Sequence, residues 1–248
     1  MATAVTTTTK PDYPFYADIP TAISGQRWLV VVAACAVAFA QLILVPDPSP
    51  LVHWIQVILF PLIPLAALAW AAPRGWTAVF RRLRLRDLPL MLGFAILNMV
   101  VTTGIAYAVG QITDTVANPA GEAIQTMAAG DRVMMLLSTI PQLIGEEVVT
   151  ILPLLALLSV LVRRLGWSRR AALLTAWVAT AVMFGAMHLP TYDWNIVQCL
   201  VIIGSARLIL SLAYMVTKNL WVSAGAHIAN DWAIFLAPIV LGGVTLLA

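Results

Sequence analysis

Five ionisable residues stand out in this sequence because each falls within or at the end of a long apolar run. Glu146 and Glu147 are adjacent in IGEEVVTILP, His188 follows in FGAMHLP, and His227 and Asp231 stand four residues apart in AGAHIAND. A carboxylate near the centre of a bilayer costs about 3 kcal/mol even on the lenient insertion scale. We therefore expect these side chains to share one polar cavity, which keeps them together at the lowest cost.

Carboxylate and imidazole are the groups with which proteins activate a water molecule, because the carboxylate accepts the proton. A second histidine, oriented by a neighbouring amide or carboxylate, can donate a hydrogen bond to the oxyanion of a tetrahedral intermediate. The i, i+4 spacing puts His227 and Asp231 on one helix face, with Asn230 beside them. Taken singly, a histidine in an apolar helix is more often a packing residue. The whole set favours hydrolysis of an amide bond.

The elements that carry these residues are hydrophobic. The chain has 248 residues, 61% of them hydrophobic and 10% charged, which excludes an ordinary soluble domain. Apolar runs of about 20 residues predict membrane spans at roughly 28–45, 52–72, 88–112, 133–162, 171–188 and 195–216. One long or two short segments fill 220–248. We predict an all-α polytopic transmembrane bundle of seven to eight spans with a polar intramembrane cavity.

Charge and composition predict the organisation of the chain. Residues 1–26 are polar and rich in turn signals, and we expect a loose cytoplasmic or interfacial arm before a single transmembrane domain at 27–248. Arginines crowd 73–87 and 163–170, whereas the connection at 113–132 is mainly acidic. Excess Lys and Arg marks cytoplasmic loops, so the N-terminus is predicted to be cytoplasmic. The net charge of +3 and the lack of a basic stripe argue against nucleic acid as a partner. Cys35 and Cys199 are expected to be buried, unpaired residues.

The order of these motifs resembles the CPBP family of intramembrane proteases, which includes the CaaX prenyl endopeptidases and bacterial Abi-type proteins. The pairs that carry the resemblance are Glu146 and Glu147 for EExxxR, Phe184 and His188 for FxxxH, and His227 and Asp231 for HxxxN/D. The resemblance implies that Glu146 and His188 activate the hydrolytic water. It also implies that His227 and Asp231 stabilise the oxyanion or orient the site, with Glu147, Phe184 and Asn230 in support.

One position departs from the family pattern, because Ile151 stands where the EExxxR motif has its arginine. That arginine is expected to pair with the second glutamate. Glu147 is then neutral, turned to water, or partnered by another group such as Thr150 or an amide from a neighbouring helix. Either the site is wired differently or its activity is reduced.

A metal site is an alternative reading of the same residues. Two histidines and one glutamate form a known set of catalytic zinc ligands, here Glu146, His188 and His227. The spacing is not the local HExxH pattern, so zinc would require three helices to meet at one ion. We favour metal-free glutamate chemistry without a cofactor.

The resulting prediction is an intramembrane endopeptidase in a bacterial plasma membrane that cuts a membrane-associated protein or peptide, including prenylated CaaX-type proteins. An inactive membrane scaffold or immunity protein is one alternative, supported by Ile151. A proton-coupled transporter is another, although the two halves of the sequence lack internal pseudo-symmetry. Pro141 and Pro153 are expected either to break the fourth span at the site or to kink it.

Overall fold

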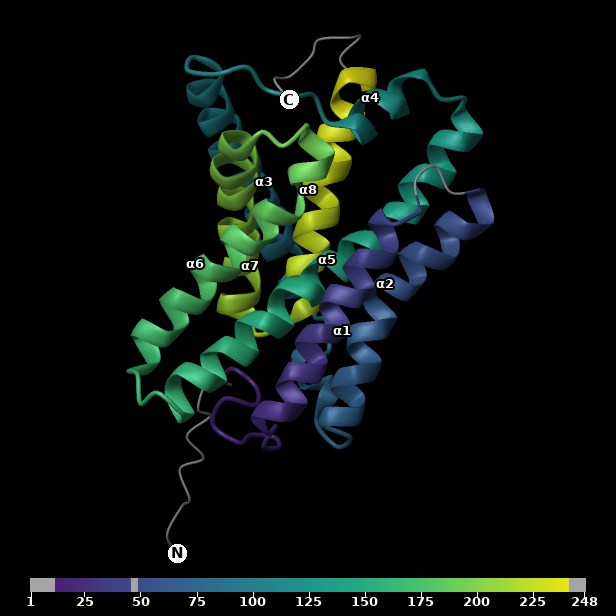
Figure 1. Cartoon of the computed structure of the whole chain (residues 1–248). Coiled ribbons are helices and arrows are strands. Elements are labelled where there is room, and N and C mark those ends of the chain that lie inside the picture. The colour runs from purple at the N-terminus through teal and green to yellow at the C-terminus, as the bar shows by residue number, and fades with distance from the viewer. Residues whose placement is uncertain (1–11, 46–48, 241–248) are drawn as a thin grey trace, which may run out of the picture.

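The computed structural model describes residues 12–45 and 49–240, and α-helices dominate these ranges (Figure 1). The helices are α1 (Gly25–Ile43), α2 (Pro50–Ala71), α3 (Leu88–Gly110), α4 (Pro119–Thr126), α5 (Ala129–Arg163), α6 (Arg169–Met187), α7 (Gly204–Thr217) and α8 (Leu220–Val240). Short 3₁₀ turns form η1 (Trp76–Val79), η2 (Leu85–Asp87) and η3 (Leu189–Tyr192), and a π-helical segment, η4 (Gln198–Ile203), leads into α7. The all-α prediction is confirmed.

Six helices in the described ranges are long and apolar enough to cross a membrane. They are α1, α2, α3 with η2, α5, α6, and α7 with η4, and each coincides with a predicted span to within a few residues. Helix α8 has 21 residues but carries three polar site residues, His227, Asn230 and Asp231, which lower its hydropathy. The count of seven to eight spans therefore stays a prediction, and residues 241–248 lie outside the described ranges.

Helix α5 is the centre of the fold. It contacts α1, α2, α6 and α8, and every residue from Glu147 to Ala156 is buried. A helix that is apolar nearly all round has to be covered on all sides, which explains its central place. It runs without interruption through Pro141 and Pro153, so of the two alternatives for these prolines the break is wrong and the kink stays a prediction. Neighbouring helices cover the backbone groups that the prolines free.

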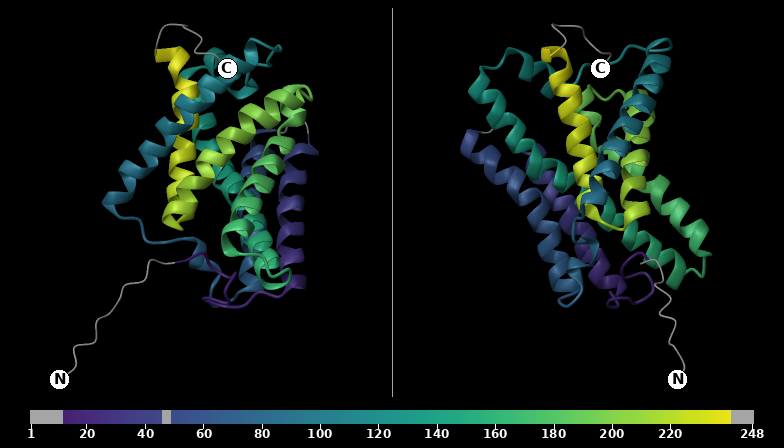
Figure 2. Two further views of the ribbon diagram at one scale, coloured as in Figure 1. Left: turned by 90° about the vertical axis from the view of Figure 1, so that its left-hand side faces the viewer. Right: turned by 180° about the vertical axis from the view of Figure 1, so that it is seen from behind.

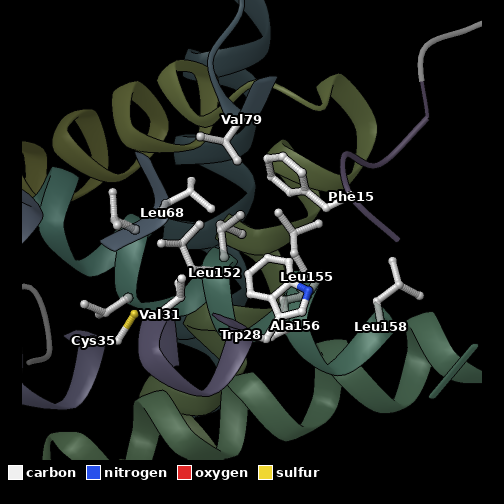
Figure 3. Packing of buried hydrophobic residues seen from close by; sticks show 14 of the residues in the cluster. Phe15, Trp28, Val31, Cys35, Leu68, Val79, Leu152, Leu155, Ala156 and Leu158 are labelled. Atoms are coloured by element: carbon white, nitrogen blue, oxygen red, sulfur yellow. The ribbon is translucent and has the colours of Figure 1, made fainter. Parts of the chain in front are cut away.

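The side of α5 that faces α1 and α2 forms the hydrophobic core (Figure 3). Leu152 and Leu155 pack there with Trp28 of α1, and Phe15 lies edge-on to Trp28 with 5.9 Å between ring centroids. Phe15 is fully buried, so the described part of the N-terminal segment is packed against the bundle rather than loose. Residues 1–11 of the predicted arm lie outside the described ranges.

The connections alternate between the two ends of the bundle (Figure 1). The start of α1 and the α5–α6 connection lie at one end, where Arg163 pairs with Asp18 at 2.7 Å. Helix α4 lies at the other end. Helices α3 and α8 run side by side, away from α1 and α2 (Figure 2). The predicted site residues lie on α5, at the end of α6 and on α8.

Candidate active site

A fully buried carboxylate on α5 ties two other helices together. Glu147 Oε1 lies 2.6 Å from Arg207 Nη2 of α7 and 3.0 Å from His227 Nδ1 of α8. The side chains of Glu147 and Arg207 are both 0% exposed. An unpaired charge at such a position would be strongly destabilising, whereas here each buried charge faces its opposite. The contacts with Arg207 and His227 explain how Glu147 can lie inside an apolar segment.

Sequence reasoning missed Arg207. Its Nε donates to Ser211 Oγ at 3.3 Å, and its guanidinium carbon lies 5.0 Å from the centroid of the Phe184 ring, within cation–π range. The available signal was a lone arginine inside the apolar run at 195–216. Thr150, one predicted partner of Glu147, instead donates its hydroxyl to the carbonyl oxygen of Glu146 at 2.8 Å.

The imidazole of His227 faces two further carboxylates. Its Nε2 lies 3.8 Å from Glu146 Oε2 and 3.7 Å from Asp231 Oδ1. Both distances are longer than a direct hydrogen bond. The side chain of Glu146 is 13% exposed, unlike Glu147, and its Oε1 accepts a 3.3 Å hydrogen bond from Gln142. The two adjacent glutamates therefore occupy different surroundings, with Glu146 on the open side.

His188 ends α6 and is held by its own helix. Its Nδ1 lies 2.8 Å from the carbonyl oxygen of Phe184, and since a carbonyl only accepts, Nδ1 carries a proton; in the neutral ring Nε2 then has the lone pair. The Phe184 ring centroid lies 4.5 Å from that of His188 and 6.4 Å from that of His227. Within the described residues, His188 has no hydrogen bond or ion pair with Glu146, so the direct contact of the predicted pair is not formed; His188 instead shares the Phe184 ring with His227.

An amide chain extends the site to α3. Asn98 Nδ2 donates to Asn230 Oδ1 at 3.1 Å, and Asn230 Nδ2 donates to Asp231 Oδ1 at 3.0 Å. Asn98 and Asn230 are both buried. Asn230, which was predicted to support the site, thus fixes the carboxylate of Asp231 through this hydrogen bond. Asn98 was not predicted; it lies in the apolar run at 88–112, as Arg207 lies in the run at 195–216.

The connections at the α4 end close over His188. Tyr192 in η3 lies over the His188 ring, with 6.4 Å between centroids, and its hydroxyl accepts a 3.1 Å hydrogen bond from Asn118. Burial raises the pKa of Tyr192, and the nearby carboxylates of Asp231 and Glu146 raise it further. The phenol therefore stays protonated at neutral pH and remains a hydrogen-bond donor.

The zinc alternative stays a prediction. The Nδ1 atom of His227 is taken by Glu147 and that of His188 by a backbone carbonyl, which leaves Nε2 of each ring as the nitrogen that could face an ion. Across residues 12–45 and 49–240, no group of three His, Cys, Asp or Glu side chains is placed to hold a metal ion. We derive no chemical step through a metal.

Comparison with known proteins gives one match. Residues 128–233 match the model of the type II CAAX prenyl endopeptidase Rce1-like family. This segment is Rce1-like. The resemblance predicted from the three motifs is confirmed over this range, and the Rce1-like segment contains every predicted site residue together with Arg207. Neither the curated proteins nor the solved structures include a significant match.

Proposed function

We propose that this protein is an intramembrane endopeptidase that hydrolyses a peptide bond of a membrane-associated substrate with a glutamate-activated water. The observation that carries the proposal is the placement of one imidazole, His227, among the carboxylates of Glu146, Glu147 and Asp231 in the Rce1-like segment. Such a cluster is costly within a hydrophobic helix bundle and marks a functional site.

Glu146 is the general base in this proposal. It removes a proton from a water bound beside its Oε2 as the water oxygen bonds to the scissile carbonyl carbon. His188, with a lone pair on Nε2, accepts a second hydrogen bond from the same water. The proton held by Glu146 then passes to the leaving amine as the carbon–nitrogen bond breaks, which returns the carboxylate to its starting state.

His227 stabilises the oxyanion. The oxygens nearest its two ring nitrogens belong to carboxylates, which only accept hydrogen bonds when ionised. The ring is therefore best satisfied with a proton on each nitrogen, and Nε2–H is the donor that faces the reacting carbonyl. Asn230 holds the carboxylate of Asp231. This carboxylate keeps the Nε2–H group of His227 turned towards Glu146.

The proposed substrate class is a membrane-associated protein or peptide, with prenylated CaaX-type substrates included because of the Rce1-like match. An inactive scaffold was favoured by Ile151, but Glu147 has a cationic partner in Arg207, so this argument for inactivity loses its basis. No feature of the candidate site gives comparable support to the alternative of a proton-coupled transporter.

The first prediction tests the general base. Glu146→Gln removes the proton acceptor with little change in shape, so we expect cleavage to fall by about 100-fold or more. The measurement is hydrolysis of fluorogenic peptides, including prenylated CaaX peptides, by the purified protein in liposomes, with and without a zinc chelator. Glu122→Gln, at an exposed position of α4, is the matched control. Loss of activity with the chelator and recovery with zinc would contradict the metal-free mechanism.

A further inference from the structure

Arg207 is the only arginine or lysine with a buried side chain among the residues that the structure describes. It lies within α7, and desolvation of a guanidinium at such a site costs several kcal/mol. A leucine or methionine would fill the same space without this cost. The charge therefore needs an explanation beyond packing.

The polar contacts of Arg207 connect it to the site through one residue, Glu147. Its Nη2 lies 2.6 Å from Glu147 Oε1, and the same oxygen lies 3.0 Å from His227 Nδ1. In the described part of the chain, Arg207 forms no hydrogen bond or ion pair with Glu146 or Asp231. The polar path from Arg207 to the reacting groups thus passes through the Glu147 carboxylate to the His227 ring, beside the contact of its guanidinium with the Phe184 ring.

We propose that Arg207 is a positioning residue, and that it supplies from α7 the positive charge that Ile151 cannot supply from α5. It anchors Glu147 Oε1, which in turn fixes the orientation of His227. The expected effect on cleavage rests on the proposed function. The orientation of His227 by Glu147 and Arg207 rests on the contacts alone. Phe184 completes the anchor, because its ring supports the guanidinium and lies between both histidines.

The backbone before α7 sets the direction of Arg207. The π-helical segment η4 ends at Ile203, four residues before Arg207, and such segments shift the side chains that follow them around the helix. Gly185 of α6 allows the close approach, because a Cβ there would lie 2.5 Å from the carbonyl oxygen of Cys199 in η4. Arg207 therefore follows a segment whose backbone packs directly against the backbone of α6.

The geometry of α5 provides a charge-relocation test. Ile151 is fully buried and stands four residues after Glu147, so an arginine at 151 lies on the same helix face as the carboxylate. We expect Arg207→Leu to lower kcat about 100-fold with little change in KM, as for a misplaced catalytic group. Ile151→Arg alone should also reduce activity, since two guanidinium groups then compete for Glu147. The double variant Arg207→Leu/Ile151→Arg should recover about tenfold or more over Arg207→Leu.

A second readout does not depend on a substrate. The chain has three histidines, His53, His188 and His227, so ¹⁵N-histidine NMR resolves few signals. The Nδ1 signal of His227 should shift in Arg207→Leu, because the oxygen it bonds has lost its other partner, and should return towards the wild-type position in the double variant. His53, which bonds Ser138 on the other side of the bundle, should not move.

Two further variants keep the test decisive. Arg207→Lys retains the charge and should stay folded even if Arg207→Leu does not, with activity within about tenfold of wild type. Arg170→Leu, at an exposed position of α6, controls for the loss of an arginine. An unmoved His227 signal in Arg207→Leu, a double variant no better than Arg207→Leu, or a raised KM at unchanged kcat would overturn the proposal. If wild type cleaves nothing, the proposed function fails while the NMR result still decides the role of Arg207.

Discussion

His227 is the residue on which the site converges. One ring nitrogen is oriented by Glu147, and the other faces Glu146 and Asp231 at nearly equal distances. The ring lies on α8, Glu146 and Glu147 lie on α5, and Phe184 on α6 supports it from the side. The surroundings of this single side chain therefore depend on how α5, α6 and α8 are placed relative to one another.

Removal of this ring should cost transition-state stabilisation rather than binding. We predict that His227→Ala lowers kcat by about 100-fold, or about 3 kcal/mol of barrier, if Nε2–H supplies one oxyanion donor. The measurement is steady-state cleavage of the best peptide found for the wild-type protein. His53→Ala, in α2, is the matched control and should retain full activity. A His227→Ala enzyme with wild-type kcat would assign the oxyanion donor to another group.

The sequence singled out the ionisable residues of the candidate site more readily than the residues that support them. Glu146, His188 and His227 were recognisable because ionisable residues are expensive in apolar runs. Arg207 and Asn98 are also polar residues within apolar runs, but nothing in their local spacing says which distant residue they contact. Their partners lie 60 and 132 positions away in the chain, so only helix packing reveals them.

At the scale of elements, the close contact between α6 and η4 positions both Phe184 and Arg207. Gly185 lies at this contact, where an added Cβ would meet a backbone carbonyl 2.5 Å away. Backbone cannot move aside as a flexible side chain can. The contact therefore has little tolerance for added volume.

We predict that Gly185→Ala destabilises the protein by about 1–3 kcal/mol, because overpacking forces the two backbones apart. The measurement is thermal unfolding of the purified protein in detergent, together with peptide cleavage. Gly104→Ala on α3 is the control, since a Cβ there meets nothing within 4 Å and alanine favours a helix. Equal unfolding temperatures for both variants would show that α6 and η4 can separate at no cost.

The bounds of the helices could be predicted from the apolar runs, whereas the continuity of α5 through its two prolines could not. The runs agree with the six span-length helices because bilayer thickness fixes how long an apolar segment must be. Pro141 and Pro153 suggested a broken span, yet α5 continues through both. A proline removes one hydrogen bond, and whether the helix breaks depends on the surrounding helices, which local sequence does not describe.

At the scale of the whole molecule, the two ends differ in charge. The α5–α6 connection carries Arg163, Arg164, Arg169 and Arg170, whereas the polar connection at the other end contains α4 with Glu122. The positive-inside rule predicts that the arginine-rich end is cytoplasmic. The same end carries the packed N-terminal segment, in which Asp12 pairs with Arg169.

We predict that Arg82→Cys reacts with a membrane-impermeant thiol reagent only after permeabilisation, while Gln125→Cys reacts in intact cells. Both positions are exposed, and the two native cysteines are buried, so the parent protein should label weakly. Mass shift after labelling is the measurement. The opposite pattern would place the N-terminus outside, and labelling of both positions from outside would contradict the alternation of the spans.

The sharing of Glu147 Oε1 between α7 and α8 also bears on how the protein is made. A nascent chain released up to the end of α6 carries Glu146, Glu147 and His188 but lacks both groups that bind the central carboxylate. The site is completed only when the last two helices dock. Under the proposed function, the order of synthesis therefore acts as a safeguard, since an unfinished hydrolase is inert beside the proteins being inserted next to it.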